Sequence, residues 1–301
     1  MSLEFETAFE PSYGRAVPVA KDILRVTVNN PGPFTFHGTN SYIVGSDTLA
    51  VIDPGPEDSA HFEALMATIA GRPVSHIFVS HTHRDHSPLA ARLKAATGAV
   101  TVAEGAYRSA RPLRIGGLNP LDASNDTEFT PDLHLSDDQV IDGDGWSIRG
   151  VFTPGHAANH MAFALEGTGV LFSADHVMAW ATTIVAPPDG AMADYVASLH
   201  KLLARDDRIY FPGHGGPVRK PLPFLRGLKA HRKMRERAIL ERLRAGDRTV
   251  ASMVTAIYRD TDPALHGAAG LSVLAHLEDL TSRGDALTDG DVSIDGVFRP
   301  A

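Results

Sequence analysis

The chain has 301 residues, 43% of them hydrophobic and 21% charged, which is enough for one large domain with an appendage or for two domains. Its net charge of −8 argues against a dedicated binder of duplex DNA, because such binding needs many cations to neutralise phosphates. The absence of cysteine excludes disulfides, thiolate metal sites, iron–sulfur clusters and a cysteine nucleophile, whereas 15 histidines are about twice the usual share.

Neither a membrane span nor a signal peptide is predicted. No stretch approaches the roughly 20 apolar residues of a transmembrane helix. The start of the chain is acidic and lacks the cationic and apolar regions of a secretory signal. We therefore expect a cytoplasmic protein with no membrane partner.

Short apolar runs alternate with helical patterns through the first two-thirds of the chain. Each run is rich in Val, Ile and Phe and is bounded by Gly, Pro, Asn or Asp, as strands are. The predicted strands are residues 23–28, 41–44, 49–52, 76–79, 100–103, 147–152, 161–165, 170–172 and 209–211. Residues 62–69 and 195–203 have the apolar spacing of an amphipathic helix. This alternation predicts a layered α/β fold.

Two regions depart from the alternation. Residues 104–138 are long and polar, which is consistent with a functional lid and equally with a solvated insertion. From Pro221 the pattern becomes helical and basic, with eleven Lys and Arg against three Asp and Glu between Arg219 and Arg248. Residues 250–258 and 271–280 then predict two helices, and residues 286–298 a short hairpin, as in a small winged-helix-like unit. We expect a layered domain over 1–218 and a basic helix with this unit over 219–301.

Candidate metal ligands follow four of the predicted strands. The first cluster is His81-Thr82-His83-Arg84-Asp85-His86, and single clusters contain His156, Asp175 and His214. Loops at one edge of layered sheets converge, so four clusters in the same position relative to their strands indicate one site. Imidazole and carboxylate ligands suit zinc and also accept iron or manganese.

The order His-x-His-x-Asp-His, Gly-His, Asp and Pro-Gly-His resembles the metallo-β-lactamase superfamily of binuclear metallohydrolases. The resemblance implies an αββα sandwich of two mixed sheets with the site at one edge. It also implies that His81, His83 and His156 hold the first of two zinc ions. Asp85, His86 and His214 would hold the second, and Asp175 would bridge both. Asp53 matches the aspartate that orients a ligand histidine in this family, although a plain turn residue is the alternative.

The same resemblance favours hydrolysis over other chemistry. A bridging carboxylate is typical of members that act on esters, thioesters, lactones and phosphodiesters, with a metal-bridging hydroxide as nucleophile. Asp175 and Asp85 are therefore the predicted catalytic residues, and Asp85 is the candidate for moving a proton. His160 and His176 are expected to pack or hydrogen-bond near the site, with a general-acid role as the less favoured reading.

The segments 30–35 and 38–42 and the basic helix around His231 resemble the β-lactamase-like protein 2 branch. This resemblance favours a phosphodiesterase, with single-stranded RNA or a small molecule as substrate. The winged-helix-like unit, which has few Lys and Arg, is expected to pack on the catalytic domain or to build a homodimer. The candidate substrate contacts are Asn40, His231 and Arg232, although a cationic run is as often a solvated face. The negative total charge instead favours a thioesterase or lactonase similar to hydroxyacylglutathione hydrolase. A metal-dependent binding protein without turnover is the alternative outside enzymes.

Overall fold

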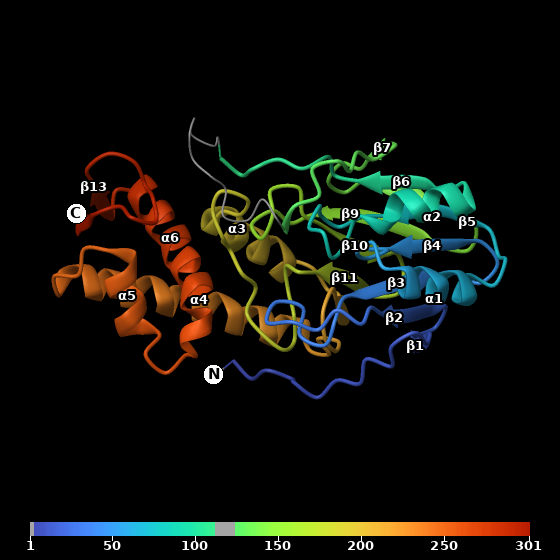
Figure 1. The fold of residues 1–301 in the computed structure, drawn as a ribbon, viewed down its shortest axis with the longest axis horizontal. Coiled ribbons are helices and arrows are strands. Elements are labelled where there is room, and N and C mark those ends of the chain that lie inside the picture. The colour runs from blue at the N-terminus through green and yellow to red at the C-terminus, as the bar shows by residue number, and fades with distance from the viewer. Residues whose placement is uncertain (1–2, 112–123) are drawn as a thin grey trace.

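The predicted sandwich of two β-sheets between helices is confirmed. The computed structural model describes residues 3–111 and 124–301. In Figure 1 the sheets lie at one end of the molecule and the last helices at the other, and the N-terminal segment runs along the lower edge.

The first sheet has seven strands in chain order. The pairings among the first four strands are antiparallel, and those from the fourth strand onward are parallel. The strands are β1 (Val17–Ala20), β2 (Ile23–Thr27), β3 (Asn40–Val44), β4 (Leu49–Ile52), β5 (Val74–Phe78), β6 (Val100–Ala103) and β7 (Leu133–His134). Parallel neighbours need crossovers, and α1 (Ser59–Ile69) and α2 (Leu89–Thr97) provide them on the outer face.

The second sheet has five strands in the order β12-β11-β10-β9-β8. Its strands are β8 (Val140–Asp142), β9 (Ser147–Phe152), β10 (Met161–Leu165), β11 (Val170–Ala174) and β12 (Ile209–Pro212). Only β11 and β12 are parallel, and α3 (Met192–Leu203) connects them. Strands β10 and β11 are buried along their whole length because a sheet covers one face and helices cover the other.

Aromatic side chains fill the space between the sheets. Phe78 of the first sheet packs edge-on against Phe163 of the second, with ring centroids 5.3 Å apart. Tyr42 and Phe172 make a similar contact at 5.1 Å. This shared core fixes the position of one sheet relative to the other, and so also fixes the position of the loops at their edges.

The C-terminal unit contains the predicted helices and hairpin. Its elements are α4 (Pro221–Arg244), α5 (Val250–Ile257), the 3-10 helix η2 (Pro263–Leu265), α6 (His266–Ser282), β13 (Ala286–Thr288) and β14 (Phe298–Pro300). Helix α4 belongs to both parts of the molecule. Leu225 and Leu228 pack with the second sheet, whereas Ile239 and Leu243 lie in the core formed with α5, α6 and the hairpin.

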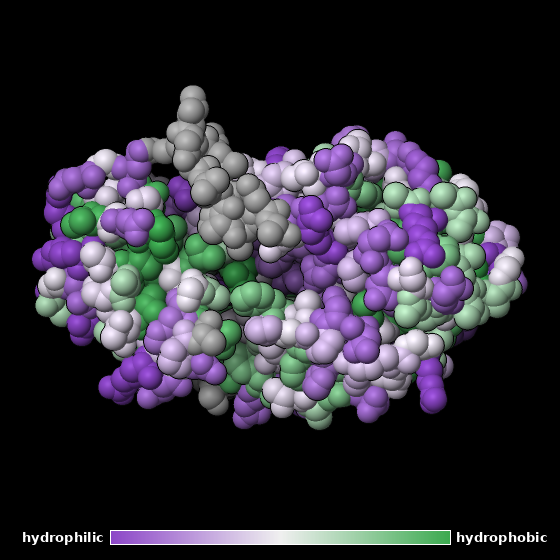
Figure 2. All heavy atoms as spheres, in the orientation of Figure 1, coloured by the Kyte–Doolittle hydropathy of each residue, from purple (hydrophilic) through white to green (hydrophobic). Residues whose placement is uncertain are grey.

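The surface differs between the two ends of the molecule. Figure 2 shows strongly hydrophobic side chains gathered at the left of the view, over the C-terminal helices. Exposed Leu265, Leu287, Ile294 and Val297 belong to this unit. Within residues 3–111 and 124–301, no helix is both long and apolar enough to cross a bilayer.

The polar stretch 104–138 contributes strand β7 to the edge of the first sheet, where it pairs with β6. Residues 112–123 of this stretch lie outside the described part of the chain. On either side of them, the backbone N–H of Ala110 donates to Pro188 O, and that of Arg84 donates to Ser124 O. The described ends of the stretch therefore pack against loops at the edge of the sheets.

His61 makes the stability of the fold sensitive to acid. It is 4% exposed, its Nε2 lies 2.8 Å from Ser41 Oγ, and burial lowers its pKa to about 4. Below the unfolded value of about 6.5 the unfolded chain binds the proton more readily, so the free energy of unfolding falls as the pH drops from 6.5 to 4. We expect this histidine to account for up to about 3 kcal/mol of that fall.

Urea unfolding at several pH values tests the prediction. His61→Gln should reduce the loss of stability between pH 6.5 and 4. His134→Gln, which removes an exposed histidine, should leave the loss as it is in the parent chain. An equal pH dependence in the parent and in His61→Gln would contradict the prediction.

Candidate metal centre

The candidate ligands come from loops at the ends of strands in both sheets. The His81–His86 segment follows β5 of the first sheet. His156, Asp175 and His214 follow β9, β11 and β12 of the second. The structure brings these side chains into two neighbouring groups, in which the potential ligand atoms lie within 4.8 Å of one another.

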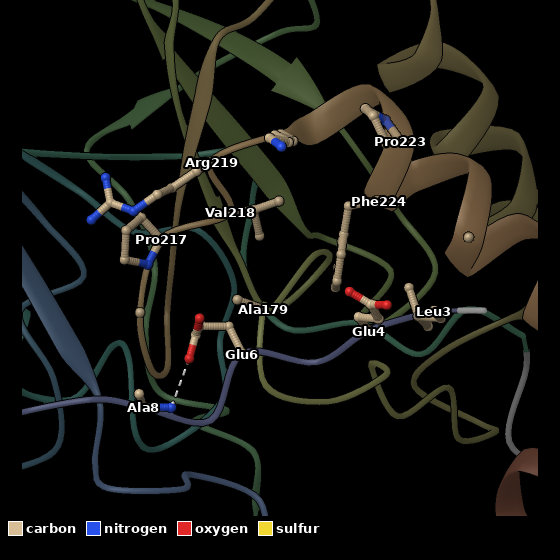
Figure 3. Close-up of a pocket in the computed structure, with 13 residues that line it drawn as sticks. Leu3, Glu4, Glu6, Ala8, Ala179, Pro217, Val218, Arg219, Pro223 and Phe224 are labelled. Carbon is tan, nitrogen blue, oxygen red and sulfur yellow. Dashed lines mark hydrogen bonds between the residues drawn. The ribbon is translucent and has the colours of Figure 1, made fainter. Parts of the chain in front are cut away.

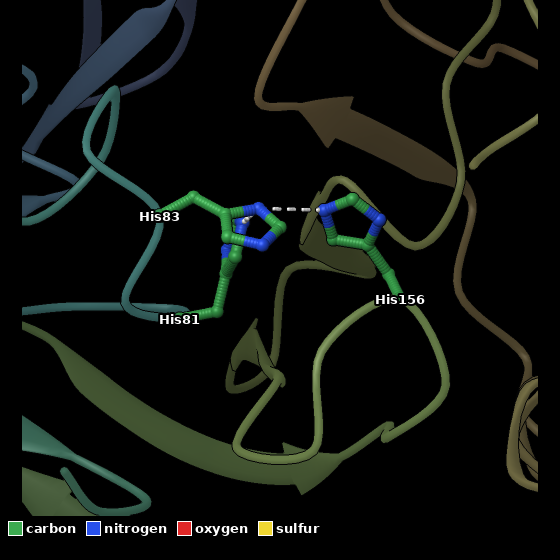
Figure 4. Close-up of side chains that lie close together, drawn as sticks. All are labelled: His81, His83 and His156. Atoms are coloured by element: carbon green, nitrogen blue, oxygen red, sulfur yellow. Dashed lines mark hydrogen bonds between the residues drawn. The ribbon is translucent and has the colours of Figure 1, made fainter. Parts of the chain in front are cut away.

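Three imidazoles form the first group. His83 Nδ1 lies 3.0 Å from His81 Nε2 and 3.0 Å from His156 Nε2. Figure 4 shows the three rings converging from two different loops. A tetrahedral ion with Zn–N bonds of about 2.0–2.1 Å keeps its nitrogens about 3.3 Å apart, so the three fit around one ion with a small expansion.

The second group combines two imidazoles and two carboxylates. His214 Nε2 is 3.2 Å from Asp85 Oδ2 and 3.2 Å from Asp175 Oδ2. His86 Nε2 is 3.3 Å from Asp85 Oδ2 and 3.5 Å from Asp175 Oδ1. Asp175 also reaches the first group, because its Oδ2 is 3.7 Å from His156 Nε2. Its carboxylate therefore lies between the two groups.

Two buried atoms of this cluster have no hydrogen-bond partner among the described residues. They are His86 Nε2 and Asp175 Oδ1. Buried polar atoms are nearly always paired, so an unpaired imidazole nitrogen facing an unpaired carboxylate oxygen points to a cation between them. The donor set of nitrogen and oxygen atoms fits two borderline cations such as zinc.

Asp53 orients two of the histidines. Its Oδ2 accepts from His86 Nδ1 at 2.9 Å and from the Ser80 hydroxyl at 2.7 Å. Because the Ser80 hydroxyl proton goes to Asp53, Ser80 Oγ must accept from His81 Nδ1, which is 2.9 Å away. Both rings therefore carry their proton on Nδ1 and present a free Nε2 lone pair to the metal site. Ser80 was not predicted to take part in the site, because a serine next to a histidine in the sequence does not by itself indicate a functional role.

Backbone carbonyls orient two further rings. His156 Nδ1 lies 2.7 Å from Ile184 O, and His214 Nδ1 lies 3.2 Å from Gly38 O. Both rings thus also direct Nε2 to the site. A hydrogen bond to a backbone carbonyl does not depend on the residue type of its acceptor, so these two contacts could not be predicted from the sequence.

The electrostatics of the second group favour a cation. Burial alone would lower the pKa of His214, but the carboxylates of Asp175 and Asp85 raise it to about 9. Burial is likewise outweighed at His86, where Asp85, Asp175 and Asp53 raise the pKa well above its usual range. In the first group, burial and neighbouring imidazoles lower the pKa of His83 to about 3. His83 thus offers a neutral nitrogen, and the second group holds negative charge that stabilises a bound positive one.

The backbone near the ligands is locally strained. Asp53 and Ala174 have φ angles of 49° and 42°, a region that costs non-glycine residues about 1–3 kcal/mol. Ala174 directly precedes Asp175, and Asp53 directly follows β4. These φ angles mark sharp turns beside two carboxylates, Asp53 and Asp175, that both contact His86.

Gly213 lies against the second group. A Cβ atom at this position would lie 2.4 Å from Asp175 Oδ1 and 2.7 Å from His86 Cε1. We expect Gly213→Ala to push these ligands apart and to weaken metal binding about 10–100-fold, as loss of ligand support does elsewhere. Chelator competition and elemental analysis would measure the effect, with circular dichroism to confirm folding.

Gly105→Ala is the matched control, because a Cβ there would meet its nearest neighbour at an ordinary 3.6 Å. Equal metal affinity in the two alanine variants would contradict the predicted collision.

The other sequence candidates lie elsewhere. Asn40 is fully buried, and its amide donates to Pro212 O and Gly215 O while its Oδ1 accepts from Thr27. Its side chain therefore holds β3 to the loop of His214 and has no atom left for a substrate. Thr39, its neighbour, donates to Asp85 Oδ2 at 3.3 Å, so this segment contacts candidate ligands through Thr39 as well as through Gly38 O.

Arg232 and His231 do not form an open cationic face. Arg232 is 4% exposed, its guanidinium lies 4.9 Å from the Tyr195 ring, and it donates to Thr183 O. Burial and nearby Arg232 lower the pKa of His231 to about 4, so the ring is neutral. Thr183 in turn donates to Asp175 O, so Arg232 supports the loop that carries a predicted ligand.

His160 and His176 lie behind the ligands. The His160 ring is 5.2 Å from that of His81, and His176 is 5.7 Å from His160. Both are fully buried, and burial lowers the pKa of His176 to about 3. Neutral, enclosed imidazoles cannot donate a proton to a substrate at the solvent side, so packing is the role that their positions support.

The site is reached from the side of its half-buried members, His83, Asp85 and His156. Asn125 lies opposite His83 in an isolated bridge, which places an inner part of the 104–138 stretch beside this approach. A separate cavity of about 620 Å³ lies next to the His214 loop, between the N-terminal segment and the start of α4, where Glu6, Arg219 and Phe224 line it (Figure 3). None of the seven candidate ligands lines this cavity.

An α/β/β/α sandwich with a histidine- and aspartate-rich centre at one sheet edge is the architecture of metal-dependent hydrolases. The sequence profile of the metallo-beta-lactamase superfamily matches residues 34–214, and that of the beta-lactamase associated winged helix domain matches residues 249–295. The chain belongs to the metallo-beta-lactamase superfamily, as the sequence analysis predicted.

Named relatives cover most of the chain. A beta-lactamase-like protein 2 homolog from Drosophila melanogaster is 28% identical over 88% of this chain and 90% of its own length. An atrochrysone carboxyl ACP thioesterase from Aspergillus fumigatus is 30% identical over 72% of this chain and 64% of its own length. A beta-lactamase domain protein from Burkholderia ambifaria shares the fold over 99% of this chain, with a TM-score of 0.80 and 21% identity. The chain is therefore a metallo-β-lactamase-fold hydrolase with a winged-helix domain.

Proposed function

We propose that this protein is a dinuclear zinc hydrolase that cleaves phosphodiesters, with single-stranded RNA as the leading substrate. The observation that carries the dinuclear centre is the pair of ligand groups that share Asp175. Bound metal ions would lower the pKa of a water molecule and polarise the bond to be cleaved.

The protein's own residues supply the arrangement for this chemistry. Asp175 lies between the groups and would hold both ions at a fixed separation. Asp53 and the two backbone carbonyls fix the imidazole orientations before a substrate arrives, which removes the cost of ordering them during the reaction. Asp85 is a ligand whose side chain is 25% exposed, so its carboxylate can also take up a proton on the approach side.

The preference for phosphodiesters rests on similarity along the chain. Beta-lactamase-like protein 2 homologs match 88–91% of the chain, and the resemblance to this branch favours a phosphodiesterase, although one thioesterase relative also covers 86% of the chain. The basic helix gives this reading less support than its sequence suggested, because Arg232 is buried under the loop that carries Asp175. An RNA substrate would therefore need other cations beside the solvent-accessible side of the metal site. Its binding should weaken as the salt concentration rises.

A thioester is the second candidate substrate. Its support is the thioesterase relative that is 30% identical, together with a net charge of −8 that disfavours a long polyanion. A non-enzymatic binding role has less support, since the ligand set and the superfamily are those of hydrolases. We also retain a homodimer as a proposal, which the exposed apolar residues of the C-terminal unit favour.

Metal content and substrate class should be measured together. Protein purified without added metal would be assayed by elemental analysis and then for turnover of bis-p-nitrophenyl phosphate and of a simple acyl thioester. Two zinc ions per chain with phosphodiester turnover would support the proposal, and thioester turnover alone would favour the second candidate. One iron ion and no hydrolysis of either substrate would contradict a dinuclear zinc hydrolase.

A further inference from the structure

Another pocket, partly open to solvent, lies between the catalytic domain and the C-terminal unit. This junction cavity has a volume of about 430 Å³ and is bounded by helices α3, α4 and α6, which lie left of the centre in Figure 1. Ligand sites of small molecules typically measure about 300–1,000 Å³, so the size suits an organic ligand rather than a single ion. None of the seven candidate metal ligands lines it.

One wall of the junction cavity is cationic. Lys229, Arg232 and Lys233 of α4 line it and form no ion pair with any carboxylate among the residues that the structure describes. Arg283 lines it as well, but its charge is offset by Glu236 at 2.9 Å and Asp279 at 3.4 Å. The lining therefore carries a net positive charge that comes from α4.

Two buried side chains that line the cavity each have one nitrogen without a partner among the described residues. Arg232 is 4% exposed and His276 is 2% exposed. Arg232 Nε and His276 Nε2 have no hydrogen-bond partner among the described residues. A buried guanidinium without a carboxylate is costly, so such a group is normally matched by an anion.

The wall formed by α3 is mostly apolar. Met192, Val196 and Ala197 line the cavity there, together with the polar His200. A ligand that satisfies both walls has an anionic group at one end and a weakly polar body at the other. Arginine and lysine together are the usual partners of phosphate, which carries up to two negative charges.

We propose that the junction cavity is a second binding site of this protein and that it takes a phosphate ester with a weakly polar body, such as a nucleotide. Its phosphate lies against Lys229, Arg232 and Lys233, and its body lies against α3. The ligand is either a free nucleotide or one nucleotide of a single strand, because the two share this chemistry. The site is separate from the metal centre and does not depend on the reaction proposed there.

Calorimetric titration of the metal-loaded protein tests the site, with adenosine 5′-monophosphate, adenosine and a short oligoadenylate with non-hydrolysable linkages as probes. The monophosphate should bind at least tenfold more tightly than adenosine. Lys229→Gln/Lys233→Gln removes two cations from half-buried and exposed positions without touching buried Arg232, and should weaken binding of the monophosphate about tenfold.

Arg226→Gln/Arg237→Gln is the matched control. It removes the same charge from exposed positions of the same helix, and neither side chain lines the cavity. If Lys229→Gln/Lys233→Gln weakens binding of both phosphate probes, the site takes free nucleotides. If it weakens binding of the oligomer alone, the site takes one nucleotide of a strand. The proposal is overturned if the two double variants bind both probes alike, since any binding would then occur elsewhere, including at the metal centre.

Discussion

Asp175→Asn should lower turnover by more than about 100-fold. Mutation of a residue that only hydrogen-bonds to a metal ligand typically costs about 10–100-fold, and loss of a ligand itself should cost more. The Asp175 carboxylate reaches ligands of both groups, and an amide can neither bridge two cations nor neutralise their charge. The metal content should fall from two ions per chain to one or fewer. Elemental analysis and turnover of the substrate identified for the parent chain would measure both effects.

Asp206→Asn provides the control, because it makes the same chemical change at an exposed position after α3. It should retain both the metal and the activity. An Asp175→Asn protein with two bound ions and parental turnover would show that the carboxylate between the groups is not a bridging ligand.

Asp53→Asn should lower metal affinity and turnover about 10–100-fold. Asp53 accepts from His86 Nδ1 and from Ser80, which in turn orients His81, so one substitution disturbs a histidine in each group. Asparagine tolerates the positive φ of 49° at this position, so the backbone should keep its turn. The loss would then be due to histidine orientation rather than to local unfolding.

Asp22→Asn is a matched control for the backbone, since Asp22 has a similar φ of 55° and is exposed. Thermal unfolding of both metal-free variants should resemble that of the parent chain. If Asp53→Asn retained full metal affinity, the role of Asp53 would be reduced to that of a turn residue, the alternative that its sequence position had left open.

Local patterns were enough to predict most strands. Residues 49–52, 100–103, 147–152 and 161–165 have the same bounds in the sequence and in the structure. These strands are apolar and are bounded by turn residues, so local and tertiary preferences agree. Strands β1, β7 and β8 were not predicted, because they lie at sheet edges, are short and are largely exposed.

Burial was harder to infer than element type. Asn40 and Arg232 look like substrate contacts because a polar side chain in a motif suggests exposure. Asn40 instead holds two loops together, and Arg232 lies under the loop of Asp175. Which face of a helix or strand is covered depends on what packs against it, and no local pattern contains that information.

The sequence by itself determined the order of strands and helices, the superfamily and the set of side chains able to bind metal, because each depends on residue type and spacing along one segment. Only the tertiary structure decided how those side chains combine into two groups around Asp175 and which ring nitrogen each histidine presents. It also decided that Arg232 of α4 is buried, whereas Lys233 of the same helix is exposed although it lines the junction cavity. These features depend on contacts between residues far apart in the chain, and packing fixes such contacts after the local structure has formed.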